Sequence, residues 1–128
     1  MTRIEITSFG FLHGAEPDAR FKIDLRHHFY DPHDHRPELR YMTAHDAAVR
    51  EAVLATGGIP ELLDAATAMI EAFAAGPVQG EPVTVAVGCA GGRHRAAAVA
   101  SVLSERCAER GFDVRLVHRD LGKDVVER

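Results

Sequence analysis

The order of apolar and polar residues predicts four short strands. Residues 4–9 form the first and run into the turn-prone Gly10. Residues 21–26 alternate apolar and polar side chains, which predicts a second strand with one buried face. Residues 83–87 are a β-branched run, typical of a buried central strand. The alternation returns over residues 112–118, where we expect the last strand.

Three helices are predicted between these strands. The first covers residues 43–56, with Thr43 as its cap and Asp46 in the capping-box position. The second places its apolar side chains on one face over residues 59–73, and the third covers residues 96–110. Residues 27–41 contain two prolines, and we expect them to be irregular rather than helical.

The resulting order, β–β–α–α–β–α–β, ends in a βαβ unit, so at least part of the sheet should be parallel. We therefore expect an α/β fold in one domain over residues 1–128, with a mixed four-stranded sheet and flanking helices. The charged tail from Arg119 is expected to be a short helix or frayed.

Composition narrows the class of protein. Apolar residues make up 46% of the chain and charged residues 27%, as in an ordinary folded domain. Two cysteines are too few for a disulfide framework. The N-terminus lacks the apolar stretch of a signal peptide, and no run approaches the roughly 20 apolar residues of a membrane span. We expect a soluble cytoplasmic protein that does not bind a membrane. Its net charge of −4 argues against broad nucleic-acid binding.

The loop from Gly88 to Arg95 (Gly-Cys-Ala-Gly-Gly-Arg-His-Arg) lies between a strand and a helix, and it predicts an anion-binding site. Glycines let backbone N–H groups turn toward a ligand, and the helix that follows adds a partial positive charge. Ala90, Arg93, His94 and Arg95 would line the same end. The loop is neither a Walker A loop nor a dinucleotide fingerprint. A glycine-rich turn without a ligand is the structural alternative.

Cys89 and Arg95 also have the Cys-x5-Arg spacing of cysteine-dependent phosphatases, in which a thiolate attacks phosphorus. Ala96 stands where those enzymes usually have Ser or Thr, and no aspartate is clearly assignable as general acid, although Asp31, Asp34 and Asp46 are candidates. Cys89 would be catalytic only in that case; otherwise we expect no catalytic residue.

Histidines are dense between His27 and His35. Such density is compatible with a flexible polar loop, with a loop that faces the ligand through Arg26 and His33, or with a metal site. The spacings match no standard zinc motif, so we expect no metal and no cofactor.

Several motifs in the chain resemble the C-terminal domain of the RNase adapter protein RapZ. They occur in the same order over nearly the whole chain, at residues 8–11, 21–26, 31–33, 39–43, 85–95 and 117–120. The resemblance implies a small α/β domain that senses glucosamine-6-phosphate and, in the full adapter, binds small regulatory RNAs and helps to deliver them to an endoribonuclease. By position, the implied ligand pocket contains Asp24, Arg26, His33, Arg40, Cys89, Gly91, Gly92, His94 and Arg95, with His118 and Arg119 nearby.

The chain departs from this family at several points. It has no Walker-type nucleotide-binding domain, so we expect no ATP or GTP function. Ala90 and Ala96 replace Thr and Ser, and the lysine-rich tail is missing. Each phosphate contact with RNA relies on a Lys or Arg, so the missing tail weakens the case for RNA delivery more than for ligand sensing.

The function predicted from the sequence is a sensor for a phosphorylated metabolite, held on Gly91-Gly92 and clamped by Arg95 and His94. Arg95→Ala should lose ligand binding while the fold survives. The first alternative is an adapter for regulatory RNA, whose binding would fall steeply with salt. The second is a phosphatase. The oligomeric state is left open, with a homodimer among the alternatives.

Overall fold

A four-stranded sheet forms the centre of the protein. The computed structural model describes residues 2–126. The strand order is β2-β3-β1-β4, and all three pairings are parallel. The strands are β1 (Arg3–Gly10), β2 (Phe21–Asp24), β3 (Val83–Cys89) and β4 (Asp113–His118).

The predicted α/β class, the four strands and the flanking helices are confirmed, but the sheet is parallel throughout rather than mixed. The difference arises between β1 and β2. The sequence shows no helix there that would mark a crossover between parallel strands. Instead, residues 11–20, which begin with the 3-10 helix η1 (Phe11–His13), carry the chain back along the sheet, so that β2 starts again at the amino end.

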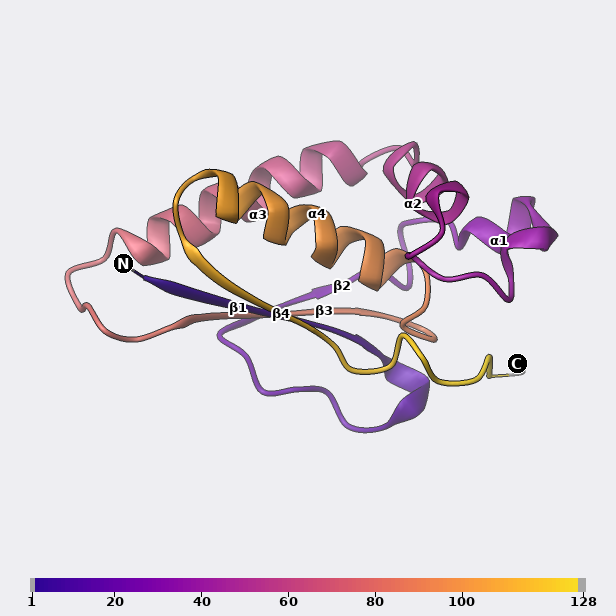
Figure 1. The fold of residues 1–128 in the computed structure, drawn as a ribbon, viewed down its shortest axis with the longest axis horizontal. Coiled ribbons are helices and arrows are strands. Elements are labelled where there is room, and N and C mark those ends of the chain that lie inside the picture. The colour runs from indigo at the N-terminus through magenta and orange to yellow at the C-terminus, as the bar shows by residue number, and fades with distance from the viewer. Residues whose placement is uncertain (1, 127–128) are drawn as a thin grey trace.

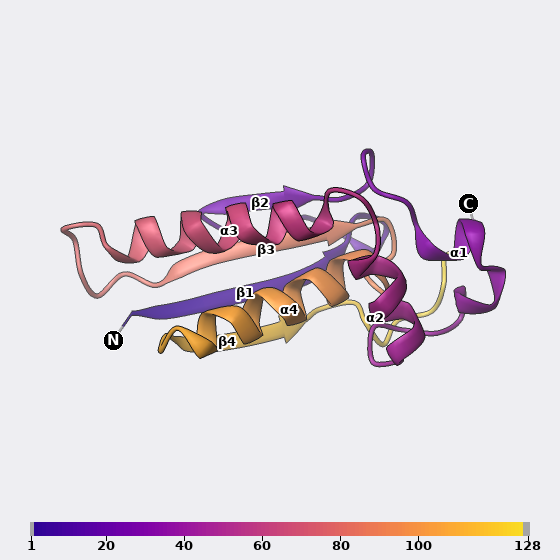
Figure 2. The same ribbon diagram turned by 90° about the horizontal axis from the view of Figure 1, so that it is seen from above.

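The three longer helices all cover the same face of the sheet (Figure 1). They are α2 (Ala47–Leu54), α3 (Ile59–Ala74) and α4 (Arg95–Glu109). Seen from above, α3 follows the β2–β3 side and α4 the β1–β4 side (Figure 2). No single helix in the described part is long and apolar enough to cross a membrane. Taken together, α2 and α3 have the length and composition of a membrane-spanning segment, but the two helices are bent by 85° relative to each other.

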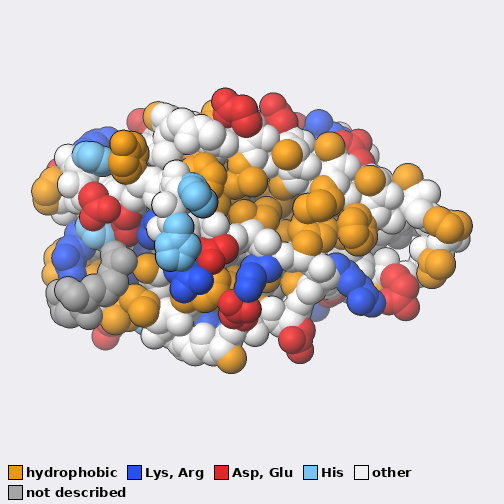
Figure 3. Space-filling model, turned by 180° about the vertical axis from the view of Figure 1, so that it is seen from behind, with side chains coloured by type: hydrophobic (Ala, Val, Ile, Leu, Met, Phe, Trp, Pro, Cys, Tyr) orange, Lys and Arg blue, Asp and Glu red, His pale blue; other side chains and the backbone are white. Residues whose placement is uncertain are grey.

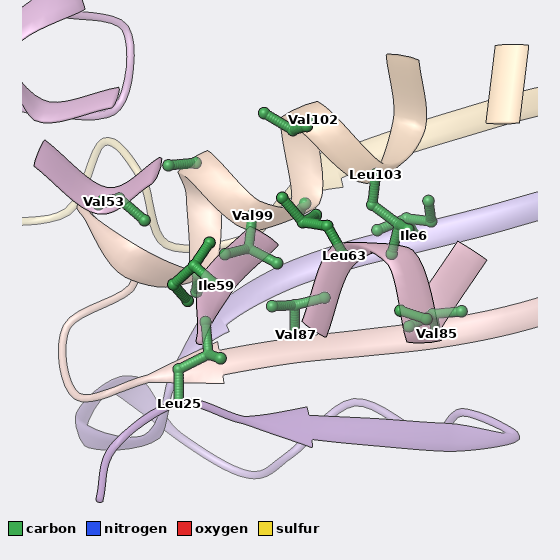
Figure 4. Close-up of a cluster of buried hydrophobic side chains, with 14 of the residues drawn as sticks. Ile6, Leu25, Val53, Ile59, Leu63, Val85, Val87, Val99, Val102 and Leu103 are labelled. Carbon is green, nitrogen blue, oxygen red and sulfur yellow. The ribbon is translucent and has the colours of Figure 1, made fainter. Parts of the chain in front are cut away.

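The core lies between the sheet and these helices (Figure 4). Ile6 and Val85 point from neighbouring strands toward Leu63 of α3 and Leu103 of α4, and all four side chains are at most 1% exposed. Burying each side chain of this size contributes about 1.5–3 kcal/mol. The apolar periodicity of residues 59–73 therefore reflects core packing.

The segment before α2 differs from the prediction. Residues 27–41 contain a short helix, α1 (Pro32–His35), and a 3-10 turn, η2 (Pro37–Leu39). Each proline occupies a first-turn position of its element, where the missing N–H costs nothing.

The helix predicted from Thr43 starts at Ala47 with Asp46 as N-cap. The side chain of Asp46 accepts the Thr43 amide at 2.9 Å, so the capping-box pair shapes the preceding turn. The described tail contains turns and no helix.

Candidate ligand-binding cavity

A cavity of about 340 Å³ opens beyond the carboxyl ends of the strands. This is the end at which α1 lies in Figures 1 and 2, and it is where parallel α/β sheets usually bind ligands. Seen from the β2–α3 side, several histidines gather toward this end (Figure 3). The cavity is lined by Leu12, Asp31, His33, Asp34, Arg40, Cys89, Gly91, Arg93, His94, Val125 and Val126.

The two glycines of the loop between β3 and α4 have different roles. Gly92 has a φ of +79°, and a Cβ there would lie 2.8 Å from the backbone nitrogen of Gly10. A Cβ on Gly10 would in turn lie 2.5 Å from the carbonyl carbon of Gly91. The backbone of the Gly91-Gly92 loop therefore crosses directly against the backbone of Gly10, at the end of β1. Apart from its chain neighbours, no atom of residues 2–126 would lie within 4 Å of a Cβ on Gly91, so that residue leaves open space beside the cavity.

Asp31 connects the histidines at the cavity wall. Its Oδ1 lies 2.8 Å from Nδ1 of His33 and 3.3 Å from Nδ1 of His94, and its Oδ2 lies 3.4 Å from Nη2 of Arg95. Burial raises the pKa of Asp31, but the hydrogen bond from His94 and the neighbouring positive charges outweigh burial and lower that pKa to about 2. Burial lowers the pKa of His33 despite the nearby Asp31 and Asp34. The carboxylate is thus ionised and held from three sides.

Arg95 points into the protein rather than into the cavity. Only 4% exposed, it donates from Nη1 to the carbonyl oxygens of Leu25 at 3.0 Å and Phe29 at 3.1 Å. Together with its pairing to Asp31, these bonds fasten the segment after β2 to the start of α4. The sequence predicted that Arg95 clamps the ligand, whereas in the structure its guanidinium donates to backbone carbonyl oxygens.

Arg93 makes similar contacts on the other side of the loop. Its guanidinium donates to the carbonyl oxygens of Tyr41 at 2.7 Å and Lys123 at 2.8 Å. Its Nε is buried and has no hydrogen-bond partner among residues 2–126. Arg93 also lines the cavity.

Cys89 is 2% exposed and lies beneath the loop. Its Sγ accepts the backbone N–H groups of Gly92 at 3.3 Å and Ala96 at 3.4 Å. In a phosphatase, this sulfur would be the nucleophile. However, Arg95 is turned away from the loop, so the Cys-x5-Arg pair does not converge on one point. Burial raises the pKa of the other thiol, Cys107.

The structure brings six of the thirteen residues predicted for the site to the cavity wall. They are His33, Arg40, Cys89, Gly91, Arg93 and His94. Arg26, Ala90 and Arg95 line a neighbouring depression, which shares Leu12 with the cavity. There the Arg26 guanidinium pairs with Asp24 at 2.8 Å and lies 3.5 Å above the ring centroid of Phe11.

Four predicted residues line neither hollow: Asp24, Gly92, His118 and Arg119. His118 is the last residue of β4, and Arg119 follows it. His118 lies between the hydroxyl groups of Ser8 at 2.6 Å and Ser101 at 3.3 Å, and burial lowers its pKa. Arg119 donates to the carbonyl oxygens of Ala15 and Gly10 and pairs with Asp120.

Asp120 supports the site, although its place in the motif at residues 117–120 predicted no role for it. It is fully buried, and its Oδ2 accepts the backbone N–H of Gly10 at 2.8 Å. Burial raises its pKa, but hydrogen bonds from Arg119, Gly10 and Lys123 outweigh burial and lower that pKa to about 2. Asp120 thereby fixes the backbone crossing under the cavity. Its position just after a strand was the available signal.

Fold and cavity together define a parallel α/β domain whose candidate ligand site lies at a glycine-rich strand-to-helix loop. The family model for the RapZ C-terminal domain matches residues 2–122, and the chain belongs to this family. A protein of Nocardioides sp. named nucleotide-binding protein is 40% identical over 95% of this chain and 40% of its own length. Proteins with the same designation from Thermobifida fusca and Parafrankia sp. are 39% and 43% identical. The chain spans about 40% of the length of these relatives.

Proposed function

We propose that this domain binds a phosphorylated small metabolite, an amino-sugar phosphate such as glucosamine-6-phosphate, as a sensor. The observation that carries the proposal is the cavity at the carboxyl edge of the sheet, where the open backbone of Gly91 lies beside Arg93 and Arg40. Membership of the RapZ C-terminal domain family supports it. The volume of about 340 Å³ suits a small ligand, since small-molecule pockets start at roughly 300 Å³.

The charges around the cavity support a ligand with both an anion and a cation. The backbone of Gly91 and the cationic side chains of Arg93 and Arg40 line the cavity and suit a phosphate group, which proteins bind with backbone N–H groups and guanidinium donors. Asp34 also lines the cavity, with its side chain 62% exposed. Asp34 can meet the ammonium group of an amino sugar, which a neutral sugar phosphate lacks.

The proposal is tested by calorimetry and thermal shift with four ligands: glucosamine-6-phosphate, glucose-6-phosphate, glucosamine and inorganic phosphate. We expect glucosamine-6-phosphate to bind most tightly and to raise the melting temperature, because it binds only the folded state. ATP and GTP belong in the panel because the relatives carry the name nucleotide-binding protein. This chain holds no Walker A loop, and we expect no shift with either nucleotide.

A matched pair of glycine substitutions localises the binding. Gly91→Ala adds a methyl group to open space beside the cavity, whereas Gly57→Ala adds one to open space beside α2. Neither glycine has a positive φ, so both variants should fold. We expect Gly91→Ala to weaken glucosamine-6-phosphate at least tenfold and Gly57→Ala to leave the affinity unchanged. Equal affinities in all three proteins would contradict the proposed site.

A further inference from the structure

Three side chains from two distant segments form a compact donor set at the cavity wall. Asp31, His33 and His94 each place one ligand atom within 4.8 Å of the other two. The Asp31 Oδ1 lies 2.8 Å from Nδ1 of His33 and 3.3 Å from Nδ1 of His94. Ligand atoms of a tetrahedral zinc ion with bonds of about 2.0–2.1 Å lie about 3.3 Å apart. We propose that Asp31, His33 and His94 bind a divalent transition-metal ion of the Zn²⁺ class.

The hydrogen bonding of His94 favours this assignment. Its Nε2 lies 2.9 Å from the carbonyl oxygen of Met42, and because a carbonyl only accepts, Nε2 must carry a proton. In the neutral ring, Nδ1 then presents a lone pair toward the carboxylate oxygen of Asp31. A cation has to lie between these two lone pairs, either the proton that gives the hydrogen bond from His94 to Asp31 or a metal ion bound in its place. Metal-binding histidines usually donate their second N–H to a carbonyl or carboxylate in this way.

His33 presents the same arrangement from the other side. Its Nδ1 is buried and makes no well-aligned hydrogen bond within residues 2–126, although Asp31 Oδ1 is 2.8 Å away. The rings of His33 and His94 meet edge to face with centroids 5.5 Å apart. Nδ1 of His33 and Nδ1 of His94 therefore both approach the same carboxylate oxygen of Asp31.

Arg95 orients the carboxylate. Its Nη2 lies 3.4 Å from Oδ2 of Asp31, which leaves Oδ1 directed at the two histidines. Asp31 would then bind through one oxygen. Two histidines and one carboxylate are a known zinc ligand set that leaves a fourth position open. All three residues line the cavity, so an open position would face a ligand there.

Sequence spacing conceals this set, because His94 follows Asp31 by 63 residues and belongs to a different loop. The inference stands apart from phosphate binding, since metal alone is the probe. If the protein binds Zn²⁺ but no sugar phosphate, the metal site stands and the proposed function is refuted. If it binds a sugar phosphate but no Zn²⁺, the proposed function stands and the metal site is refuted.

The test titrates EDTA-treated, dialysed full-length chain with Zn²⁺ by calorimetry and with Co²⁺ by visible absorption. We expect one equivalent of Zn²⁺ per chain and a Co²⁺ spectrum of tetrahedral intensity. His33→Ala should weaken Zn²⁺ binding at least tenfold. His35→Ala is the matched control, because His35 lies exposed on the same short helix, and it should bind like the unmodified chain.

A second measurement uses the unmodified chain, so that the proposal is still tested if a variant fails to fold. Histidine ¹⁵N spectra should show Zn²⁺ shifting Nδ1 of His33 and of His94, while Nε2 of His94 keeps its proton. Binding that is absent, that survives His33→Ala, or that is lost equally in His35→Ala would overturn the proposal, as would unshifted Nδ1 resonances.

Discussion

Replacing Arg95 by alanine should damage the fold itself. The guanidinium is buried, donates to the carbonyl oxygens of Leu25 and Phe29, and pairs with the buried Asp31. Alanine would leave these oxygens without their donor and leave an ionised carboxylate in the interior. The expectation from sequence, that the fold survives this change, rested on a side chain facing the ligand.

The size of the loss follows from the burial of both partners. Removing one partner of a buried ion pair typically costs about 3–5 kcal/mol, because the other charge stays buried without compensation. Domains of this size are stable by only about 5–15 kcal/mol in total. Arg95→Ala should therefore lose a large part of the free energy of unfolding. Arg95→Lys keeps the charge but loses the planar fork, and we expect an intermediate loss.

The assay is urea unfolding followed by circular dichroism, with Arg110→Ala as the control. Arg110 follows α4 and forms an exposed ion pair with Glu71 at 3.3 Å. Exposed pairs contribute about 0–1 kcal/mol, so this variant should stay close to the unmodified chain. A loss below about 1 kcal/mol for Arg95→Ala would refute the structural role of Arg95.

The remaining predictions concern the support of the cavity and its thiol. In the same urea assay, Gly92→Ala should lower the free energy of unfolding by about 2–4 kcal/mol, because alanine is strained in the left-handed region and its methyl group displaces the Gly10 backbone. A change under about 0.5 kcal/mol would contradict the close approach of the two backbone segments. Because the pKa of Asp120 falls from 3.8 to about 2 on folding, its ionised form stabilises the fold by about 2 kcal/mol above pH 4, and this contribution is lost as pH falls toward about 2. The stability deficit of Asp120→Asn should accordingly shrink from about 2 kcal/mol at pH 6 to below about 1 near pH 2, and a constant deficit would contradict this linkage. With Arg95 turned away from Cys89, we expect no turnover of an aryl phosphate, and turnover abolished by Cys89→Ser would restore the phosphatase alternative.

The parts of the fold that depend on local patterns were predictable from the sequence. The β-branched run of residues 83–87 and the apolar face of residues 59–73 were sufficient to predict β3 and α3. The parallel placement of β2 was not, because a loop and a hairpin turn have similar composition over residues 11–20. Prolines at first-turn positions likewise concealed α1.

The location of the cavity could be predicted from the sequence, but the contacts of its side chains could not. A glycine-rich loop between a strand and a helix indicated which end of the sheet to examine, and six predicted residues line the cavity there. Composition alone does not tell whether an arginine faces an anion or a backbone carbonyl. Arg95 faces backbone carbonyls, and its role is therefore structural. The approach of Asp31 to His94 depends on the tertiary fold alone.

The central claim, that the cavity beside Gly91 holds a phosphorylated metabolite, is tested most directly by amide chemical shifts. ¹⁵N-labelled protein would be titrated with glucosamine-6-phosphate. We expect the largest shifts at the amides of Gly91 and Arg93, with little change at Thr7 and Arg115, which line a hollow away from this cavity. Unchanged amides at Gly91 and Arg93 under saturating ligand would contradict the account.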